Sequence, residues 1–188
     1  LALSSVASLS LHFTVGDWPN VSRALRRGLD AYSEPYRPAK YFAHAVWFLE
    51  DTGVEGRIYT DYPLGGFMSF WLSPSLEMAS SGTMNVERGA MERFLAIGAH
   101  GLGTEGADLD ELLDASGVDL FLGTGLPVTG TAARPIPTTV RHVERHPDWI
   151  PVFRSLRSAV YLRRPGGTGT DRDRRAEVNL ARIEAWYR

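Results

Sequence analysis

The chain has 188 residues, of which 44% are hydrophobic and 22% charged, so it can bury one sizeable core like an ordinary globular domain. Its formal net charge of -2 gives no overall basic field, which argues against a nucleic acid as partner. No window reaches the roughly 18 consecutive apolar residues that a membrane-spanning helix needs, so we expect no membrane span within this segment. The absence of cysteine excludes disulfides and thiolate metal sites and leaves the redox compartment open.

The chain starts at Leu1 and lacks the basic start of a secretory signal, so we expect it to be a piece of a longer protein. The first element is a predicted strand at Leu9–Val15, where apolar residues alternate with polar ones. A helix follows, with apolar Val21, Leu25 and Leu29 at a spacing of four and arginines between them.

The middle of the chain alternates helical and extended patterns. In chain order we expect a helix at Pro38–Asp51, a strand at Arg57–Thr60, a glycine turn at Asp61–Gly66 leading into a helix that ends near Leu72, a strand at Leu76–Ser80, a helix at Val86–Ala99, a helix at Asp108–Ala115, an interior strand at Val118–Leu122, a loop at Thr129–Pro137 and a helix at Thr138–Arg145. Pro38 suits a first helical turn, Gly53 suits a helix end, and Asp108 is an acidic cap. Such alternation favours a largely parallel sheet.

The C-terminal part begins with two runs of β-forming residues, Trp149–Ser155 and Ser158–Arg163, which predict an antiparallel hairpin at one edge of the sheet. We therefore expect a single α/β domain at residues 1–164. Its predicted fold is a three-layer αβα sandwich with a mostly parallel, Rossmann-like sheet and this C-terminal antiparallel hairpin.

Residues 165–175 concentrate glycine, threonine and charge, which is typical of a flexible linker. Residues 176–188 regain a helical pattern through Val178, Ile183 and Trp186. This C-terminal helix either docks back on the domain or begins a further helical module.

The order of motifs resembles one family. A helix opened by Pro38, then Gly56–Phe67, then Trp71–Pro74, is similar to the soluble domain of bacterial GT-C-type membrane glycosyltransferases. In that family a helix leads to a strand, a Gly-Gly turn, an aromatic stretch ending in proline, and a second strand with an Asp-Gly-Arg-like motif. The resemblance extends through the predicted hairpin to Arg163. It departs from the family at Ser81-Gly82-Thr83, which lacks both charged side chains of the last motif, so no ligand contact is carried over there.

The resemblance implies an auxiliary role. In GT-C proteins the catalytic carboxylate is expected in loops attached to membrane helices, and no such helix is present in this chain. The domain would then lie at the extracytoplasmic face of the cytoplasmic membrane and serve acceptor binding, positioning or assembly. Its expected partners are the rest of its own membrane-embedded chain and a saccharide or lipid-linked saccharide, and no cofactor is expected.

Six residues at the predicted strand ends are the candidates for ligand contact, because open α/β sheets commonly bind ligands at the carboxyl ends of their strands. They are Asp61, Tyr62, Gly65, Gly66, Gly123 and Gly125. The Asp61 carboxylate could bind a sugar hydroxyl, although an aspartate that stabilises a turn is the commoner case. Nearby Phe67, Phe70 and Trp71 offer either a sugar-stacking platform or core packing, and packing is the more usual role.

Three other patterns give no catalytic or metal site. Gly101–Gly106 has the spacing of a dinucleotide fingerprint, but it follows a helical pattern rather than a strand. His142 and His146 have a zinc-compatible spacing without a third ligand, and we expect a solvent-facing helix end. No Gly-x-Ser-x-Gly elbow is present, so the domain itself is expected to carry no catalytic residue. The alternative that remains open is a free-standing α/β enzyme or a small-ligand binder that uses the strand-end glycine turns.

Overall fold

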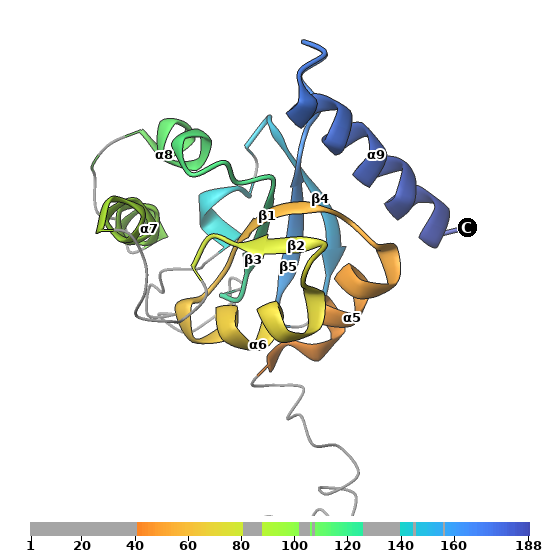
Figure 1. Ribbon diagram of the computed structural model, residues 1–188, viewed down its shortest axis with the longest axis horizontal. Coiled ribbons are helices and arrows are strands. Elements are labelled where there is room, and N and C mark those ends of the chain that lie inside the picture. The colour runs from red at the N-terminus through yellow and green to blue at the C-terminus, as the bar shows by residue number, and fades with distance from the viewer. Residues whose placement is uncertain are drawn as a thin grey trace, which may run out of the picture. The chain divides into compact units, whose positions relative to one another are not determined.

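The computed structural model describes most of one compact unit of the chain, residues 38–188 (Figure 1). The described residues are 41–80, 88–101, 106, 108–125, 140–144, 146–155 and 157–188. The strand expected at Leu9–Val15, the helix through Val21, the Ser81–Thr83 motif and the loop at Thr129–Pro137 lie outside them.

Five strands form one open sheet with the order β2-β1-β3-β5-β4. They are β1 (Gly56–Tyr59), β2 (Leu76–Met78), β3 (Leu120–Gly123), β4 (Trp149–Arg154) and β5 (Ala159–Arg163). Strand β1 is parallel to β2 and β3, whereas β5 is antiparallel to β3 and β4. The sheet is therefore mixed, and the expectation of a mostly parallel sheet is wrong. The short turn between β4 and β5 forces those strands to be antiparallel, and β5 rather than β4 joins the parallel part.

The described chain contains five α-helices, and some of their ends have recognisable capping signals. They are α5 (Ala43–Thr52), α6 (Tyr62–Leu72), α7 (Arg88–Gly101), α8 (Leu109–Ala115) and α9 (Asp171–Trp186), with one 3-10 turn, η1 (Val140–His142). Helix α5 ends at Gly53, whose positive φ of 60° is costly for other residues. Helix α8 begins at Asp108, whose carboxylate accepts hydrogen bonds from the N–H groups of Asp110 and Glu111, as the sequence predicted.

Two apolar clusters use alternate residues of the same strands. Ile58, Leu120 and Leu162 pack with residues of α5, α6 and α9. Tyr59, Phe121 and Tyr161 pack with residues of α7 and α8. Because successive side chains of a strand point to opposite faces, the two clusters lie on opposite faces of the sheet. Figure 1 shows α7 and α8 on the other side of the strands from α9.

Helix α9 docks back on the domain, which is one of the two possibilities that the sequence left open. Ile183 is buried in the cluster with α5 and α6, and the Tyr187 hydroxyl donates to the carbonyl of Val152 at 2.7 Å. The helix begins at Asp171 rather than at residue 176, so residues 171–175 of the predicted linker are helical. Thr170 caps the helix by accepting from the N–H of Asp173, a local signal that the glycine-rich composition concealed.

Candidate functional site

The carboxyl ends of β1, β2 and β3 lie side by side, because these three strands are parallel neighbours. The register pairs Ile58 with Met78 and Tyr59 with Phe121. Within two residues after these pairs come Thr60, Asp61, Ser80 and Gly123, which therefore lie at one edge of the sheet. This edge is where open α/β sheets present ligands.

Asp61 occupies the N-cap position of α6 but does not use its carboxylate as a cap. Its backbone carbonyl accepts from the N–H groups of Leu64 at 2.9 Å and Gly65 at 3.2 Å. Burial raises the pKa of the half-buried Asp61 carboxyl, and the backbone N–H of Tyr62 offsets part of that rise. The Asp61 carboxylate therefore lies at the strand end and does not serve as the cap of α6, so it can accept hydrogen bonds from a ligand.

The expected glycine turn at Asp61–Gly66 is not present, because α6 already begins at Tyr62. Pro63 lies in the first turn, where its missing N–H is not needed and its fixed φ suits a helix. Gly65 and Gly66 are therefore helical, Gly65 buried and Gly66 exposed. The Tyr62 ring lies edge-on to Phe94 at 6.1 Å, in the cluster beneath α7. Of this segment, only Asp61 is held at the strand end as the sequence suggested.

Gly123 is the last residue of β3 rather than part of a turn after it. It is buried and pairs with Ala159 across to β5, so its backbone takes part in the sheet. Gly125 follows two residues later in an isolated bridge position and is only half buried. Both Gly123 and Asp61 lie two residues beyond the pair of Tyr59 with Phe121, so the structure brings these two candidates to the same edge.

Two hydroxyls at this edge were not singled out by the sequence. Thr60 is 2% exposed and Ser80 is 4% exposed, and neither side-chain oxygen has a hydrogen-bond partner within the described residues. A buried hydroxyl without a partner costs about 1–3 kcal/mol, so native proteins usually satisfy it with protein, water or ligand. Their only sequence signal is that each lies within two residues of the end of a strand.

The aromatic residues of α6 divide between packing and exposure. Phe67 is half buried and stacks on Tyr41, with ring centroids 4.4 Å apart. Phe70 is 77% exposed and lies edge-on to Trp71, which is 37% exposed. Phe70 and Trp71 end the helix that Asp61 begins, and ten residues of helix span about 15 Å. One sugar ring could not touch both Asp61 and this aromatic pair.

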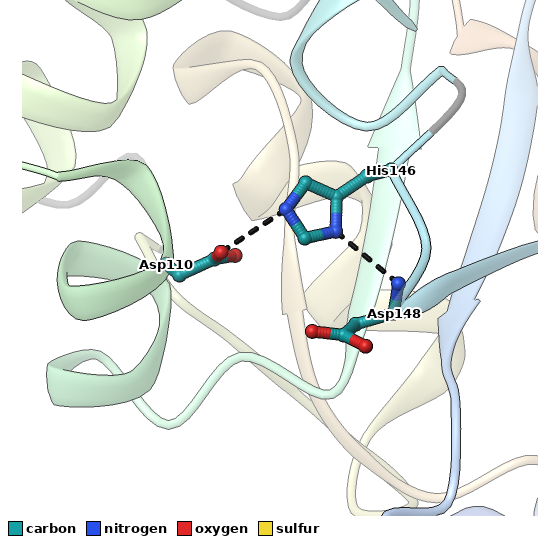
Figure 2. A group of neighbouring side chains, drawn as sticks. All are labelled: Asp110, His146 and Asp148. Carbon is teal, nitrogen blue, oxygen red and sulfur yellow. Dashed lines mark hydrogen bonds and ion pairs between the residues drawn. The ribbon is translucent and has the colours of Figure 1, made fainter.

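The two histidines considered for zinc have separate partners. The His142 ring is 8% exposed and its Nε2 bonds the carbonyl of Ile97 at 2.8 Å, so the expected solvent-facing position is wrong for it. His146 Nε2 lies 3.0 Å from an Asp110 carboxylate oxygen, and its Nδ1 accepts from the N–H of Asp148 (Figure 2). Asp110, His146 and Asp148 offer three donor atoms within 4.8 Å of one another. Since both ring nitrogens of His146 are engaged, we interpret the group as a link between α8 and the start of β4.

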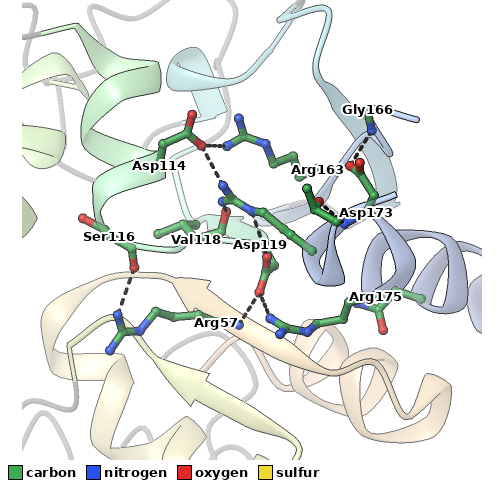
Figure 3. Close-up of polar contacts among 12 residues, drawn as sticks. Arg57, Asp114, Ser116, Val118, Asp119, Arg163, Gly166, Asp173 and Arg175 are labelled. Atoms are coloured by element: carbon green, nitrogen blue, oxygen red, sulfur yellow. Dashed lines mark hydrogen bonds and ion pairs between the residues drawn. The ribbon is translucent and has the colours of Figure 1, made fainter. Parts of the chain in front are cut away.

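Asp119 is the centre of an ionic network at the opposite, amino end of the sheet (Figure 3). This 5%-exposed carboxylate accepts from Arg172 at 3.1 Å, Arg175 at 2.8 Å and the backbone N–H of Arg57 at 3.0 Å. Gly56 has a φ of 124°, and a Cβ there would lie 2.5 Å from an Asp119 oxygen, so glycine is required. Both carboxylate oxygens have partners, which fits a role in docking α9 rather than in binding a ligand.

Comparisons with protein-family models, with curated proteins and with solved structures find no match for this chain. Within the described residues, no helix combines the length and apolar character needed to cross a membrane.

Proposed function

We propose that this chain is a non-catalytic domain of a membrane-embedded glycosyltransferase-like protein, and that it binds a saccharide acceptor at the carboxyl ends of β1 and β2. The observation that carries the proposal is the pair of buried, unpartnered hydroxyls of Thr60 and Ser80 at the strand ends where Asp61 also lies. The ordered resemblance from Pro38 to Arg163 supplies the class of parent protein.

A saccharide suits this edge because its hydroxyls both donate and accept hydrogen bonds. A carboxylate accepts from a sugar hydroxyl, and a serine or threonine hydroxyl can take either role. Asp61 has no histidine or second carboxylate bonded to it among the described residues, which supports binding rather than acid–base catalysis. The same site in a free-standing enzyme or small-ligand binder is the alternative, and turnover of a bound sugar would favour it.

The fold that we propose for this domain is a three-layer αβα arrangement. The support is the pair of apolar clusters on opposite faces of one sheet, with α5, α6 and α9 contributing to one and α7 and α8 to the other. Placement at the extracytoplasmic face, with the rest of the parent chain as partner, follows from the family resemblance. The exposed Phe70 and Trp71 at the end of α6 are the surface that we assign to that contact.

The test separates ligand binding from folding by means of hydroxyl-deleting variants. The Thr60→Val variant should be more stable than the wild type by about 1 kcal/mol, because it removes a buried polar group without a partner. The same variant should bind saccharide at least roughly tenfold more weakly, because the ligand loses a hydrogen bond that only this hydroxyl supplies. Asp61→Asn should also weaken binding while the chain stays folded, since burial already disfavours the Asp61 charge.

Thr52→Val is the matched control, because the Thr52 hydroxyl is buried but donates to the carbonyl of Phe48 at 2.7 Å. This variant should lose stability and bind saccharide like the wild type. Binding is measured by calorimetry and ligand-observed NMR on the full 188-residue chain against mono- and oligosaccharides and a short-chain lipid-linked sugar. No binding across the panel, or binding that Thr60→Val and Asp61→Asn leave unchanged, would overturn the proposal.

A further inference from the structure

A second candidate site lies beneath α7. It is a pocket of about 30 Å³ between α7, β1, the end of β2 and the end of α8. Its lining residues are Arg57, Tyr59, Ala79, Ala90, Arg93, Phe94, Ile97 and Ser116. Tyr59 and Phe94 belong to the apolar cluster with α7 and α8. The pocket therefore lies on the face of the sheet opposite to Ile58, which belongs to the other cluster.

Both arginines of the pocket keep a buried N–H group without an acceptor. The Arg57 side chain is held by the carbonyl of Ser116 at 3.0 Å and the carboxylate of Glu77 at 2.6 Å, but its Nε has no partner. The Nε of Arg93 also has none, and no hydrogen bond or ion pair of the Arg93 side chain exists within the described residues. Two guanidinium groups, each with an unpartnered Nε–H, thus contribute to the lining of one small pocket.

The net charge of the pocket is positive. Glu77, on the neighbouring position of β2, neutralises Arg57, whereas the charge of Arg93 stays uncompensated within the described residues. The remaining walls are largely apolar, from Ala79, Phe94 and Ile97. Such walls lower the local dielectric and strengthen the attraction for an anion.

We propose that this pocket binds a small oxyanion, a carboxylate or phosphate group, between the guanidinium groups of Arg57 and Arg93. Guanidinium donors match the spacing of paired oxygens on carboxylates and phosphates. A water molecule needs about 10–15 Å³, so the pocket has room for about two oxygen-sized atoms, such as a carboxylate head or two phosphate oxygens. The bonds from Arg57 to Ser116 and Glu77 fix its guanidinium before any ligand arrives.

The experiment titrates sodium phosphate and, separately, sodium acetate into the full chain at constant ionic strength, followed by ¹H–¹⁵N NMR. Saturable shifts are expected for the arginine Nε–H signals and for the amides of Tyr59, Ala79 and Ala90. The Arg93→Gln variant should raise the Kd by roughly tenfold or more. The Arg93→Lys variant should recover only part of the affinity, because lysine restores the charge without the planar donor pair.

Arg88→Gln is the matched control, since Arg88 is an exposed arginine at the start of the same helix and does not line the pocket. It should leave both affinities unchanged. The preferred anion identifies the ligand group, with phosphate indicating a phosphoryl compound and acetate a carboxylate. Absence of saturable shifts with both anions, or an equal loss in Arg88→Gln, would overturn the proposal. These variants change no residue of the proposed saccharide site. The result of this experiment is therefore independent of the saccharide-binding proposal.

Discussion

The Asp173 carboxylate shows how one side chain fixes the entry to α9. It accepts hydrogen bonds from the backbone N–H groups of Gly166 at 2.7 Å and Thr168 at 2.8 Å, and from the Thr168 hydroxyl. These bonds favour the ionised form and hold the pKa of Asp173 far below its ordinary value. The stability that they contribute is therefore present above the ordinary aspartate pKa of about 4 and is lost as the pH falls below it.

Asp173→Asn should accordingly destabilise the chain at pH 7, and the difference from the wild type should shrink as the pH is lowered towards 3. An asparagine side chain cannot accept all three hydrogen bonds. Protonation at low pH weakens the same hydrogen bonds in the wild type, so the two chains become more alike in stability. Urea unfolding of both chains at pH 7, 5 and 3 measures this trend. Asp171→Asn, in the same turn but with an exposed side chain, should show little effect. A difference that stays constant from pH 7 to pH 3 would contradict this role of the Asp173 charge.

Residues also explain which part of the candidate site the sequence could reveal. Asp61 was recognisable because it follows a predicted strand, and open α/β sheets commonly bind ligands at the carboxyl ends of their strands. Thr60 and Ser80 were not, because a hydroxyl's lack of a partner depends on neighbours from distant parts of the chain. The pairing of Arg57 with Arg93 around one pocket likewise joins β1 to α7, which no local spacing predicts.

At the scale of elements, Asn179 binds α9 to the segment before β1. Its side-chain oxygen accepts from the N–H of Glu55 at 2.9 Å, and its amide nitrogen donates to the carbonyl of Glu55 at 2.7 Å. The Asn179 residue is fully buried. One side chain thus satisfies both backbone groups of a residue that belongs to no helix or strand.

Asn179→Ala should lower the free energy of unfolding by about 2 kcal/mol, because it leaves both Glu55 backbone groups without a partner in a partly buried place. Glu177→Ala, on the exposed face of the same helix, is the control and should change stability by less than about 0.5 kcal/mol. Chemical denaturation of the three chains compares these values. Equal stability of Asn179→Ala and the wild type would show that α9 does not depend on this contact.

Elements whose local signals all agree were predicted well, and those in which glycines lie beside the start of a helix were not. Helix α8 and the β4–β5 hairpin lie where the sequence placed them, because each has its signal within a few residues. The starts of α6 and α9 were placed too late. In both cases glycines suggested a turn or linker, whereas Pro63 in the first turn and the Thr170 cap determined the start.

For the whole molecule, α9 completes the core and neutralises a buried charge. Without it, Asp119 would lose the guanidinium groups of both Arg172 and Arg175, and Ile183 would leave the cluster beside α5. Breaking one buried ion pair typically costs 3–5 kcal/mol, which is a large part of the 5–15 kcal/mol that stabilises an ordinary domain. The stability of the domain therefore depends on contacts between α9, at the end of the described chain, and elements much earlier in it.

A chain that ends at Arg164 should fail to unfold cooperatively on heating and should bind a hydrophobic dye such as ANS. A synthetic peptide of residues 165–188, added in excess, should restore a cooperative transition. A full-length Val178→Ser chain is the control, because Val178 is 48% exposed and its change should leave the transition intact. Cooperative unfolding of the shortened chain at the wild-type temperature would show that α9 is dispensable for the core.

The order of strands in the sheet could not be deduced from the sequence, since periodicity identifies a strand without naming its neighbours. It has a consequence for synthesis on the ribosome. Strand β3 is central, yet its partner on one side, β5, is made only after η1 and β4 have followed it. While the chain emerges, one edge of β3 therefore remains unpaired. The Asp119 carboxylate gains its ion pairs with Arg172 and Arg175 even later, because α9 is made after β5. A nascent chain of this kind would gain most of the order of this domain late, in one step that is completed when α9 leaves the exit tunnel.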